Sequence, residues 1–299
     1  MDIDQIKHRR WHSSVTYDAA NIIPYNLAIG ASGQDLRRCW EDHPEFHALP
    51  TFTSLAVINI MGKVTRDMPT LMPRYKPEEH PHVHAEHYLE MKQALPTSGT
   101  LESEARILDV VDRRSGVAVI VGITTKEAKT GADICYNEWT SFLIKMPGDG
   151  ASKISPSNAR KSTSIPDRKH DTGVDHQTTS NQGALYRAAT GEWNPLHIDP
   201  GHGRRAGFPG PILSGTCTIG VGVRHVIDSF AGGDSKRFKS VRLRLSKPVF
   251  PGQTIRPQMW EEDDGKRIVY QQVAEDGRVV IAQAEIALSP NAGSVRSQL

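Results

Sequence analysis

The sequence predicts an α+β protein made of two copies of one unit, in which a curved antiparallel sheet wraps a central helix. A faint repeat relates the two halves at an offset of 161 residues, so that Tyr25 and Gly30 fall on Tyr186 and Gly191. Each half contains one apolar stretch of helical length. Segments that alternate between apolar and polar residues follow each stretch, as in antiparallel strands with one buried face.

The apolar stretches of the two halves, FTSLAVINIMG and ILSGTCTIGVGV, correspond in the repeat. In the second half, residues 211–230 suit a buried helix that tolerates glycines. The strand-like segments after it are KSVRLRLSKPVF, RPQMW, KRIVYQQVAED and RVVIAQAEIAL. The first half closes with SEARILDVVDRRSGVAVIVGITTKEA and ICYNEWTSFLI, which predict strands in the same order.

A polar segment rich in Pro, Ser and Gly, residues 147–183, separates the halves. It has little periodicity and predicts a long connection over the surface. We therefore divide the chain into an N-terminal half, 1–150, and a C-terminal half, 151–299.

Composition excludes several classes of protein. A formal charge of +2 over 299 residues argues against a general nucleic-acid binder, which would carry a basic stripe. No apolar run approaches the ~18–20 residues of a membrane span, so membrane insertion is not expected. The three cysteines are an odd number and lie far apart, which indicates free thiols in a reducing compartment.

The segment GEWNPLHIDP places Glu192, Asn194 and His197 within six residues. Pro195 pushes Asn194 into an extended conformation, which favours a loop. Glu192 and His197 can form a general acid/base pair if both point into one pocket, and Asn194 can orient a substrate or water. A solvated carboxylate, a surface histidine and an Asx turn are the alternatives.

The repeat is asymmetric at these positions, because the first half has Ala31, Gly33 and Leu36 there. Only the second half can do acid/base work, and the first half is expected to accommodate substrate. Gly215 begins the predicted helix, where backbone N–H groups could form an oxyanion hole. Close packing of helix on sheet would explain this glycine equally well.

The segment HPHVHAEHYLE, residues 80–90, contains four histidines. No cysteine lies nearby and no known zinc spacing occurs, so a metal is not expected. Arg242, Arg244 and Lys247 lie among alternating apolar residues, which is typical of a strand with one solvated face.

The stretch YRAATGEWNPLHIDPGHGRRAGFPGPILSGTCTIG resembles the signature of the (R)-specific 2-enoyl-CoA hydratases with the MaoC-like hotdog fold, including the hydratase unit of peroxisomal multifunctional enzyme type 2. The likeness extends to YNLAIGAS, FHALPTF, HAEHYLEM, LPTSGTL and DRRSG in the first half and to RFKSVRLRLSKPVFPGQT near the end. It implies a double hotdog whose second half is catalytic. The implied reaction is reversible hydration of a trans-2-enoyl-CoA to a (3R)-3-hydroxyacyl-CoA.

The resemblance also implies site residues. The catalytic residues would be Glu192, Asn194, His197 and, through its backbone amide, Gly215. Residues that contact the acyl-CoA would be His84, Ala85, Arg113, Trp193, Pro195 and Leu196. No metal or organic cofactor is implied, the partner is the acyl-CoA substrate, and a homodimer is allowed.

Three positions depart from the family pattern. Glu192 replaces the usual Asp, Ser214 stands where many members have His, and Ala85 replaces Gly. These changes suggest a dehydratase in a specialised biosynthetic pathway, one that makes polyketides or products derived from fatty acids. A hotdog acyl-CoA thioesterase and a catalytically weakened acyl-binding protein are the alternative functions.

The family is habitually peroxisomal, and the sequence ends in Ser297, Gln298 and Leu299. This tripeptide differs by one residue from the peroxisomal address S-K-L. We expect a peroxisomal protein, and a cytoplasmic one if the tail is not recognised.

Overall fold

A single antiparallel sheet of 11 strands forms the frame of the computed structural model, which describes residues 3–148, 157–158 and 163–290. The strand order is β1-β3-β4-β5-β2-β8-β11-β10-β9-β6, and β7 also pairs with β9. The strands are β1 (Arg10–Tyr17), β2 (His82–Met91), β3 (Gly99–Arg113), β4 (Gly116–Glu127), β5 (Asp133–Ile144), β6 (Thr172–Gly173), β7 (His176–Gln177), β8 (Phe238–Leu245), β9 (Thr254–Glu262), β10 (Arg267–Ala274) and β11 (Val279–Leu288).

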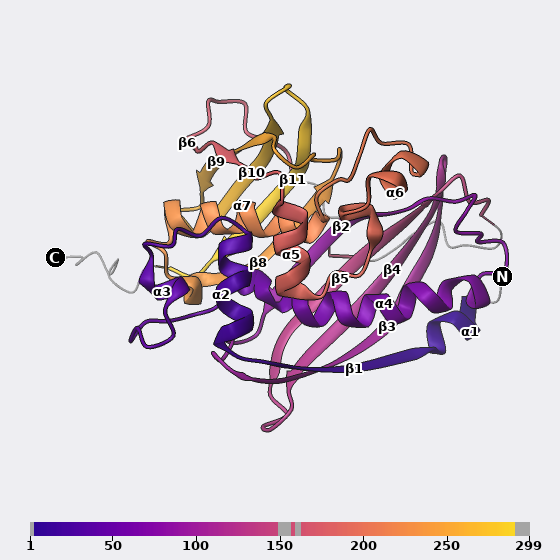
Figure 1. The fold of residues 1–299 in the computed structure, drawn as a ribbon, viewed down its shortest axis with the longest axis horizontal. Coiled ribbons are helices and arrows are strands. Elements are labelled where there is room, and N and C mark those ends of the chain that lie inside the picture. Colours follow the sequence, from indigo (N-terminus) through magenta and orange to yellow (C-terminus); the bar gives the residue numbers. More distant parts are fainter. Residues whose placement is uncertain (1–2, 149–156, 159–162, 291–299) are drawn as a thin grey trace.

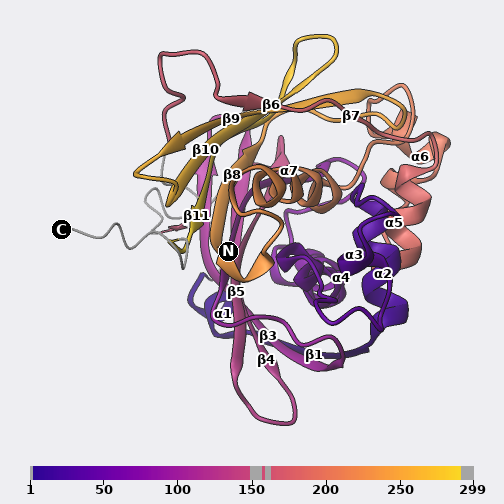
Figure 2. The same cartoon turned by 90° about the vertical axis from the view of Figure 1, so that its left-hand side faces the viewer.

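The helices lie on one face of this sheet. They are α1 (Ile3–His8), α2 (Ala19–Ala28), α3 (Leu36–Cys39), α4 (Ser54–Leu71), α5 (Gln182–Thr190), α6 (Pro200–Arg205) and α7 (Gly215–Phe230), with short 3₁₀ turns η1 (Pro50–Thr53), η3 (Pro195–His197) and η4 (Ser235–Arg237). The sheet curves around α4 and α7, and α2 and α5 lie outside these two (Figures 1 and 2). This is the predicted α+β hotdog arrangement, made twice.

The two halves are related by an approximate two-fold axis at the centre of the sheet. Strands β2 and β8 pair antiparallel there, and Tyr88 lies opposite Arg242, which is 154 positions further along the chain. The same separation relates Leu95 to Val249 in the segments after these strands. The helices follow the offset of 161, because α4 begins at Ser54 and α7 at Gly215. The two sheets that the sequence predicts are thus joined edge to edge into one.

The central helix of the second half is the glycine-tolerant helix expected over 211–230, although it begins at Gly215. Its glycines allow close packing. A Cβ at Gly220 would come within 2.8 Å of Ile29 Cγ2, and one at Gly222 would overlap the Gln272 side chain. This close approach explains how a helix with low intrinsic propensity is buried in the core.

The segment 147–183, which we predict to be a long connection over the surface, also contains two short strands. Strands β6 and β7 extend the sheet beside β9, with Thr172 opposite Met259 and His176 opposite Ile255. Two-residue strands bury no alternating face, so no hydrophobic pattern marks them in the sequence. The division of the chain at residue 150 stays a prediction.

Buried contacts hold the halves together. The rings of Tyr25 and Tyr186 lie 5.9 Å apart, on α2 and α5. The guanidinium of Arg38 is 2% exposed and contacts the Asp228 carboxylate at 2.5 Å. Arg224 donates a hydrogen bond from α7 to the Ile29 carbonyl at 3.0 Å. Because these bonds cross between halves, the two units form one folded body.

Candidate active site

A cavity of about 380 Å³ lies where the loop after α5 faces α4 and the start of β2. The second half contributes Glu192, Asn194, His197 and Gly215 to its lining, and the first half contributes apolar groups such as Ile58. The loop begins because Gly191 ends α5 with a left-handed φ of 68°. The predicted catalytic loop therefore opens into a pocket that both halves build.

The Glu192 carboxylate is buried, with 6% of the residue exposed, and hydrogen bonds fix both of its oxygens. Oε1 accepts from the Asn194 backbone N–H at 3.1 Å. Oε2 accepts from the Ser214 hydroxyl at 3.1 Å. Donors of this kind stabilise a charged carboxylate in a buried place and keep it in one orientation.

Asn194 shapes the loop. It is extended, with φ −69° and ψ 119°, as its position before proline predicts. Its Oδ1 accepts from the Leu196 N–H at 3.0 Å, so the side chain caps η3 in an Asx turn. The Asx turn, which is the alternative explanation for Asn194, is therefore present. Its amide nitrogen is the group that remains for a ligand.

His197 is held in one tautomer by the backbone. Its Nδ1 lies 2.9 Å from the Ile212 carbonyl oxygen. A carbonyl oxygen can only accept, so Nδ1 carries the proton and Nε2 presents a lone pair. Burial lowers the pKa of His197 below its ordinary value of 6.5, and the negative charge of Glu192 opposes that shift. The ring is neutral at neutral pH and can act as a base.

Gly215 is the first residue of α7. The first N–H groups of a helix have no acceptor within the helix, and no described residue accepts the Gly215 N–H. A Cβ here would come within 2.6 Å of Leu245 Cδ1 and 3.1 Å of His84 Nδ1. Glycine thus leaves room for an oxygen atom at the positive end of the helix.

His84 enters the cavity from β2 through a β-bulge. The pairing of β2 with β5 shifts between His84 and Glu86, so Ala85 is the extra residue. The His84 ring stacks on Trp139 with centroids 3.5 Å apart. Both ring nitrogens are buried without a hydrogen-bond partner among the described residues. Burial and the nearby His87 and His82 lower its pKa well below 6.5.

The remaining predicted substrate residues lie at different distances from the cavity. Trp193 and Leu196 line it, whereas Pro195 and Ala85 are not among the lining residues. Trp193 packs on α4, where a Cβ at Gly62 would meet its Nε1 at 2.8 Å. Arg113 is the last residue of β3 and lies opposite Gly116 of β4. Gly116 in turn lies opposite Ile144 of β5, which lines the cavity. Arg113 therefore lies two strands from the cavity wall.

Sequence reasoning missed part of the wall. Trp139, Ile58 and Met61 line the cavity from the first half. The buried face of α4 could have indicated Ile58 and Met61, but nothing local to Trp139 distinguishes it from a core residue.

No group of three or more metal-ligating side chains that could hold a metal ion occurs in the described part of the chain. The absence of a metal or organic cofactor stays a prediction. None of the described helices is both long and apolar enough to cross a membrane.

Comparison with known families and proteins gives one consistent result. Residues 15–145 match the MFE-2 hydratase 2 N-terminal domain, and residues 161–284 match the MaoC-like domain. The chain is 38% identical to the peroxisomal multifunctional enzyme type 2 of Mus musculus, over 97% of this chain and 39% of that protein. It is 32% identical to the peroxisomal enoyl-CoA hydratase 2 of Arabidopsis thaliana, over 93% of this chain and 92% of that protein.

Among solved structures, a MaoC-like dehydratase from Phytophthora capsici superposes with a TM-score of 0.88 at 26% identity, over 98% of this chain and 100% of that one. The full-length multifunctional enzyme type 2 of Drosophila melanogaster gives a TM-score of 0.79 at 34% identity, over 94% of this chain and 48% of that one. The chain spans less than half of the multifunctional proteins that it matches.

Proposed function

The chain belongs to the family of the hydratase 2 and MaoC-like dehydratase proteins, and from this premise we propose that it catalyses the reversible addition of water to a trans-2-enoyl thioester. It is a hydro-lyase. The observation that carries the proposal is the pair of Glu192, which is buried, and His197, which is half-buried, in one cavity with the Gly215 N–H, for which no described residue is an acceptor.

In the proposed hydration, a water molecule lies between the Glu192 carboxylate and His197 Nε2. This pair removes a proton from the water as its oxygen bonds to C3 of the enoyl group, and the pair returns a proton to C2. Negative charge develops on the thioester oxygen as the C2–C3 double bond opens. The Gly215 N–H and the end of α7 stabilise that charge. Dehydration runs through the same steps in reverse.

The finer assignments rest on the family resemblance. We propose that the carrier is CoA, that the product has the (3R) configuration, and that no cofactor takes part. The stacked rings of His84 and Trp139 offer a flat wall to the thioester end of the substrate. We also propose that Arg113, the last residue of β3, contacts a phosphate of the CoA outside the cavity.

Mass spectrometry of the product from crotonyl-CoA tests the function. We expect 3-hydroxybutyryl-CoA, which is 18 mass units heavier than the substrate because one water is added. Free crotonate would support the thioesterase alternative. Binding without turnover of any enoyl-CoA in a panel of chain lengths would support an acyl-binding protein.

The departures at Glu192 and Ser214 support a more specialised substrate. Their side chains are hydrogen-bonded to each other, so the longer acid is built into the site. We propose that the substrate differs in shape from a straight chain. A panel of straight and branched enoyl-CoAs would show higher kcat/KM for the branched ones, and Glu192→Asp would shift the preference towards straight chains.

We propose a peroxisomal location, because relatives that cover nearly the whole chain include a peroxisomal enoyl-CoA hydratase 2. Residues 297–299 lie outside the described residues. A fluorescent fusion with a free C-terminus should colocalise with peroxisomes and become cytosolic without the last three residues. Light scattering during gel filtration would test the homodimer.

A further inference from the structure

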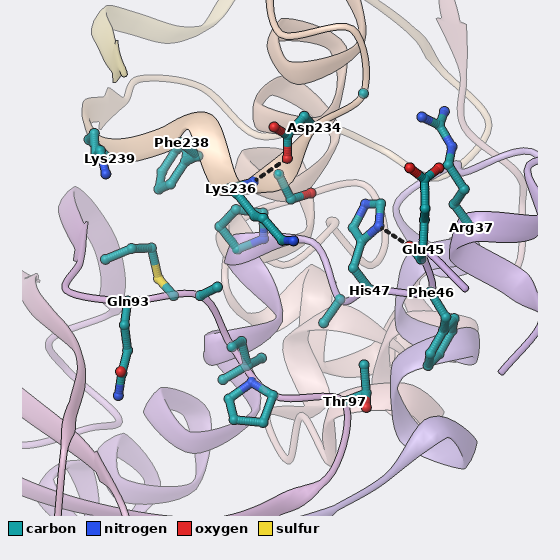
Figure 3. Close-up of a pocket in the computed structure, with 18 of the residues that line it drawn as sticks. Arg37, Glu45, Phe46, His47, Gln93, Thr97, Asp234, Lys236, Phe238 and Lys239 are labelled. Carbon is teal, nitrogen blue, oxygen red and sulfur yellow. Dashed lines mark hydrogen bonds between the residues drawn. The ribbon is translucent and has the colours of Figure 1, made fainter. Parts of the chain in front are cut away.

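Figure 3 shows a second cavity, which has a volume of about 400 Å³. The pseudo-two-fold axis relates it to the candidate active site. Parts of three segments line it, 44–50, 91–97 and 233–239, together with Arg37. Its volume is close to the 380 Å³ of the candidate active site. We call it the second cavity.

The relation between the cavities follows from equivalent positions. The strand ends Met91–Ala94 and Leu245–Pro248 are 154 residues apart, and each lines its own cavity. Lys236 and Phe238 line the second cavity at the positions that His82 and His84 occupy in the candidate active site. The frame of the pocket is therefore present twice.

The chemistry of the pocket is not repeated. The positions equivalent to Glu192, Asn194 and His197 hold Ala31, Gly33 and Leu36, and none of these three lines the second cavity. Glu45, Asp234 and His47 line the second cavity, but none of them stands at a position equivalent to Glu192 or His197. A ligand held here would not be hydrated.

The second cavity combines an apolar wall with free cations. Phe46, Leu95 and Phe238 supply the apolar surface. Among its basic residues, Arg37 and Lys92 are paired with Asp35 and Glu90. Lys236 and Lys239 are different, because neither ammonium group has an ion pair or hydrogen bond with a described residue. Figure 3 shows the Lys236 side chain extending into the cavity.

His47 adds a polar group inside the second cavity. Its Nδ1 lies 2.8 Å from the Glu45 carbonyl oxygen, so Nδ1 carries the proton of the neutral ring. Nε2 is buried and has no partner among the described residues, which leaves a lone pair that can accept an N–H. Fatty acids have no such donor, whereas the pantetheine arm of CoA carries two amide N–H groups.

We propose that the second cavity binds a second molecule of fatty acyl-CoA without converting it. The acyl chain contacts Phe46 and Leu95, a pantetheine amide donates to His47 Nε2, and the phosphates meet Lys236 and Lys239. The choice of an acyl thioester as the ligand rests on the proposed function. The apolar wall and the cations are observed in the second cavity and do not depend on that function.

Titration calorimetry with decanoyl-CoA tests the proposal, since a saturated chain has no double bond to hydrate. We expect two molecules per chain in the wild type. Ala94→Trp fills the second cavity from an exposed loop and should leave one molecule and full enoyl-CoA turnover. Pro248→Trp, at the equivalent position of the candidate active site, should also leave one molecule but abolish turnover. Circular dichroism of both variants checks their fold.

The charge contribution is tested by Lys236→Glu with Lys239→Glu. This double variant should weaken the second binding event at least about tenfold, because two ammonium groups become carboxylates. Lys169→Glu with Lys266→Glu changes the same charge on exposed residues outside both cavities and should have no such effect.

One molecule per chain in the wild type, or two in Ala94→Trp, would overturn the proposal. Decanoate that displaces the second decanoyl-CoA with equal affinity would assign the cavity to free fatty acids and overturn the thioester assignment. If CoA alone bound as tightly as decanoyl-CoA, the apolar wall would take no part in binding, and the proposed contact with the acyl chain would be wrong. Turnover of enoyl-CoA on the same samples tests the proposed function separately.

Discussion

The N-termini of α4 and α7 occupy equivalent places in the two halves but offer different groups to a ligand. At α4 the 3₁₀ turn η1 runs directly into the helix, and the Ser54 N–H donates to the Thr51 and Phe52 carbonyls. The Ser54 hydroxyl lies 3.0 Å from the Tyr186 hydroxyl. At α7 no described residue accepts the Gly215 N–H, and the position has no side chain of its own.

The loops before these helices differ in the same sense. In the second half, Glu192 is buried and its two carboxylate oxygens are hydrogen-bonded. In the first half, Leu36 replaces His197 and is 46% exposed. The second half therefore presents an unpaired amide and an acid/base pair to its cavity. In the first half, the equivalent helix end is hydrogen-bonded within the protein and the equivalent loop has no acid/base pair. The proposed chemistry depends on a few side chains and on the space left by one glycine.

The largest expected effect comes from removing the charge of Glu192. The first half has Ala31 at the equivalent position and so has no such charge. Glu192→Gln keeps the shape of the side chain and should lower kcat for hydration by about 10³-fold, within the usual range for a positioned acid or base. Steady-state kinetics on the best enoyl-CoA of the panel measures this. Near wild-type turnover would show that the carboxylate takes no part in proton transfer.

His197→Ala should lower kcat by at least about 10²-fold, since the variant loses the Nε2 lone pair. The fold should survive, because the ring makes one hydrogen bond to the backbone, at Ile212. A correctly folded variant with unchanged turnover would place the site elsewhere. Leu36→His, at the equivalent position of the first half, is the matched control and should leave turnover unchanged.

The pH dependence follows from the lowered pKa of His197. Burial lowers its pKa below 6.5, so the ring loses its base function only as the pH falls below that value. We expect kcat/KM to be constant from about pH 8 to 6.5 and to fall on the acid side. A decline that begins above pH 7 would mean that His197 is protonated too easily to serve as the base.

Local signals in the sequence predicted the loop well. Proline after Asn194 predicts an extended residue there, and the structure has it. Gly191 ends α5 with a left-handed φ, as glycine allows. The wall from the first half depends on long-range pairing. Trp139 reaches the cavity because β5 lies beside β2, and a bulge at Ala85 aims His84 at it. No short window of sequence contains that information.

The glycine at the start of α7 gives the next effect in size. A Cβ at Gly215 would crowd Leu245 and His84, at 2.6 and 3.1 Å, and would occupy the space in front of the helix. Gly215→Ala should lower kcat about 50-fold, somewhat less than the loss of a complete oxyanion donor. Ser54→Ala at the equivalent position should leave kcat unchanged within about twofold and cost about 1 kcal/mol of stability, from its bond to Tyr186.

If Ser54→Ala lowered kcat as much as Gly215→Ala, the contrast between the two helix ends would have no functional meaning. Thermal melts of both variants separate stability from catalysis. Loss of activity in Gly215→Ala with an unchanged melting temperature would indicate that the space itself is required.

The smallest effect should come from Ser214, which acts through Glu192. Its hydroxyl donates to Glu192 Oε2 at 3.1 Å, and the Asn194 N–H holds the other oxygen. Ser214→Ala should therefore leave the carboxylate in place but less firmly oriented. A hydrogen bond to a charged group is worth about 1.5 kcal/mol, so kcat should fall about tenfold.

Two measurements distinguish a loss of fold stability from a loss of Glu192 orientation as the cause of the lower kcat in Ser214→Ala. Ser214 stands at the N-cap of α7, yet its side chain makes no capping hydrogen bond, so alanine removes no cap and the melting temperature should change little. In the Glu192→Gln background the same substitution should have almost no further effect on kcat, because the group that it orients has already lost its function. A full tenfold loss in both backgrounds would mean that Ser214 contacts the substrate directly. The orientation of the Glu192 carboxylate would then not depend on Ser214.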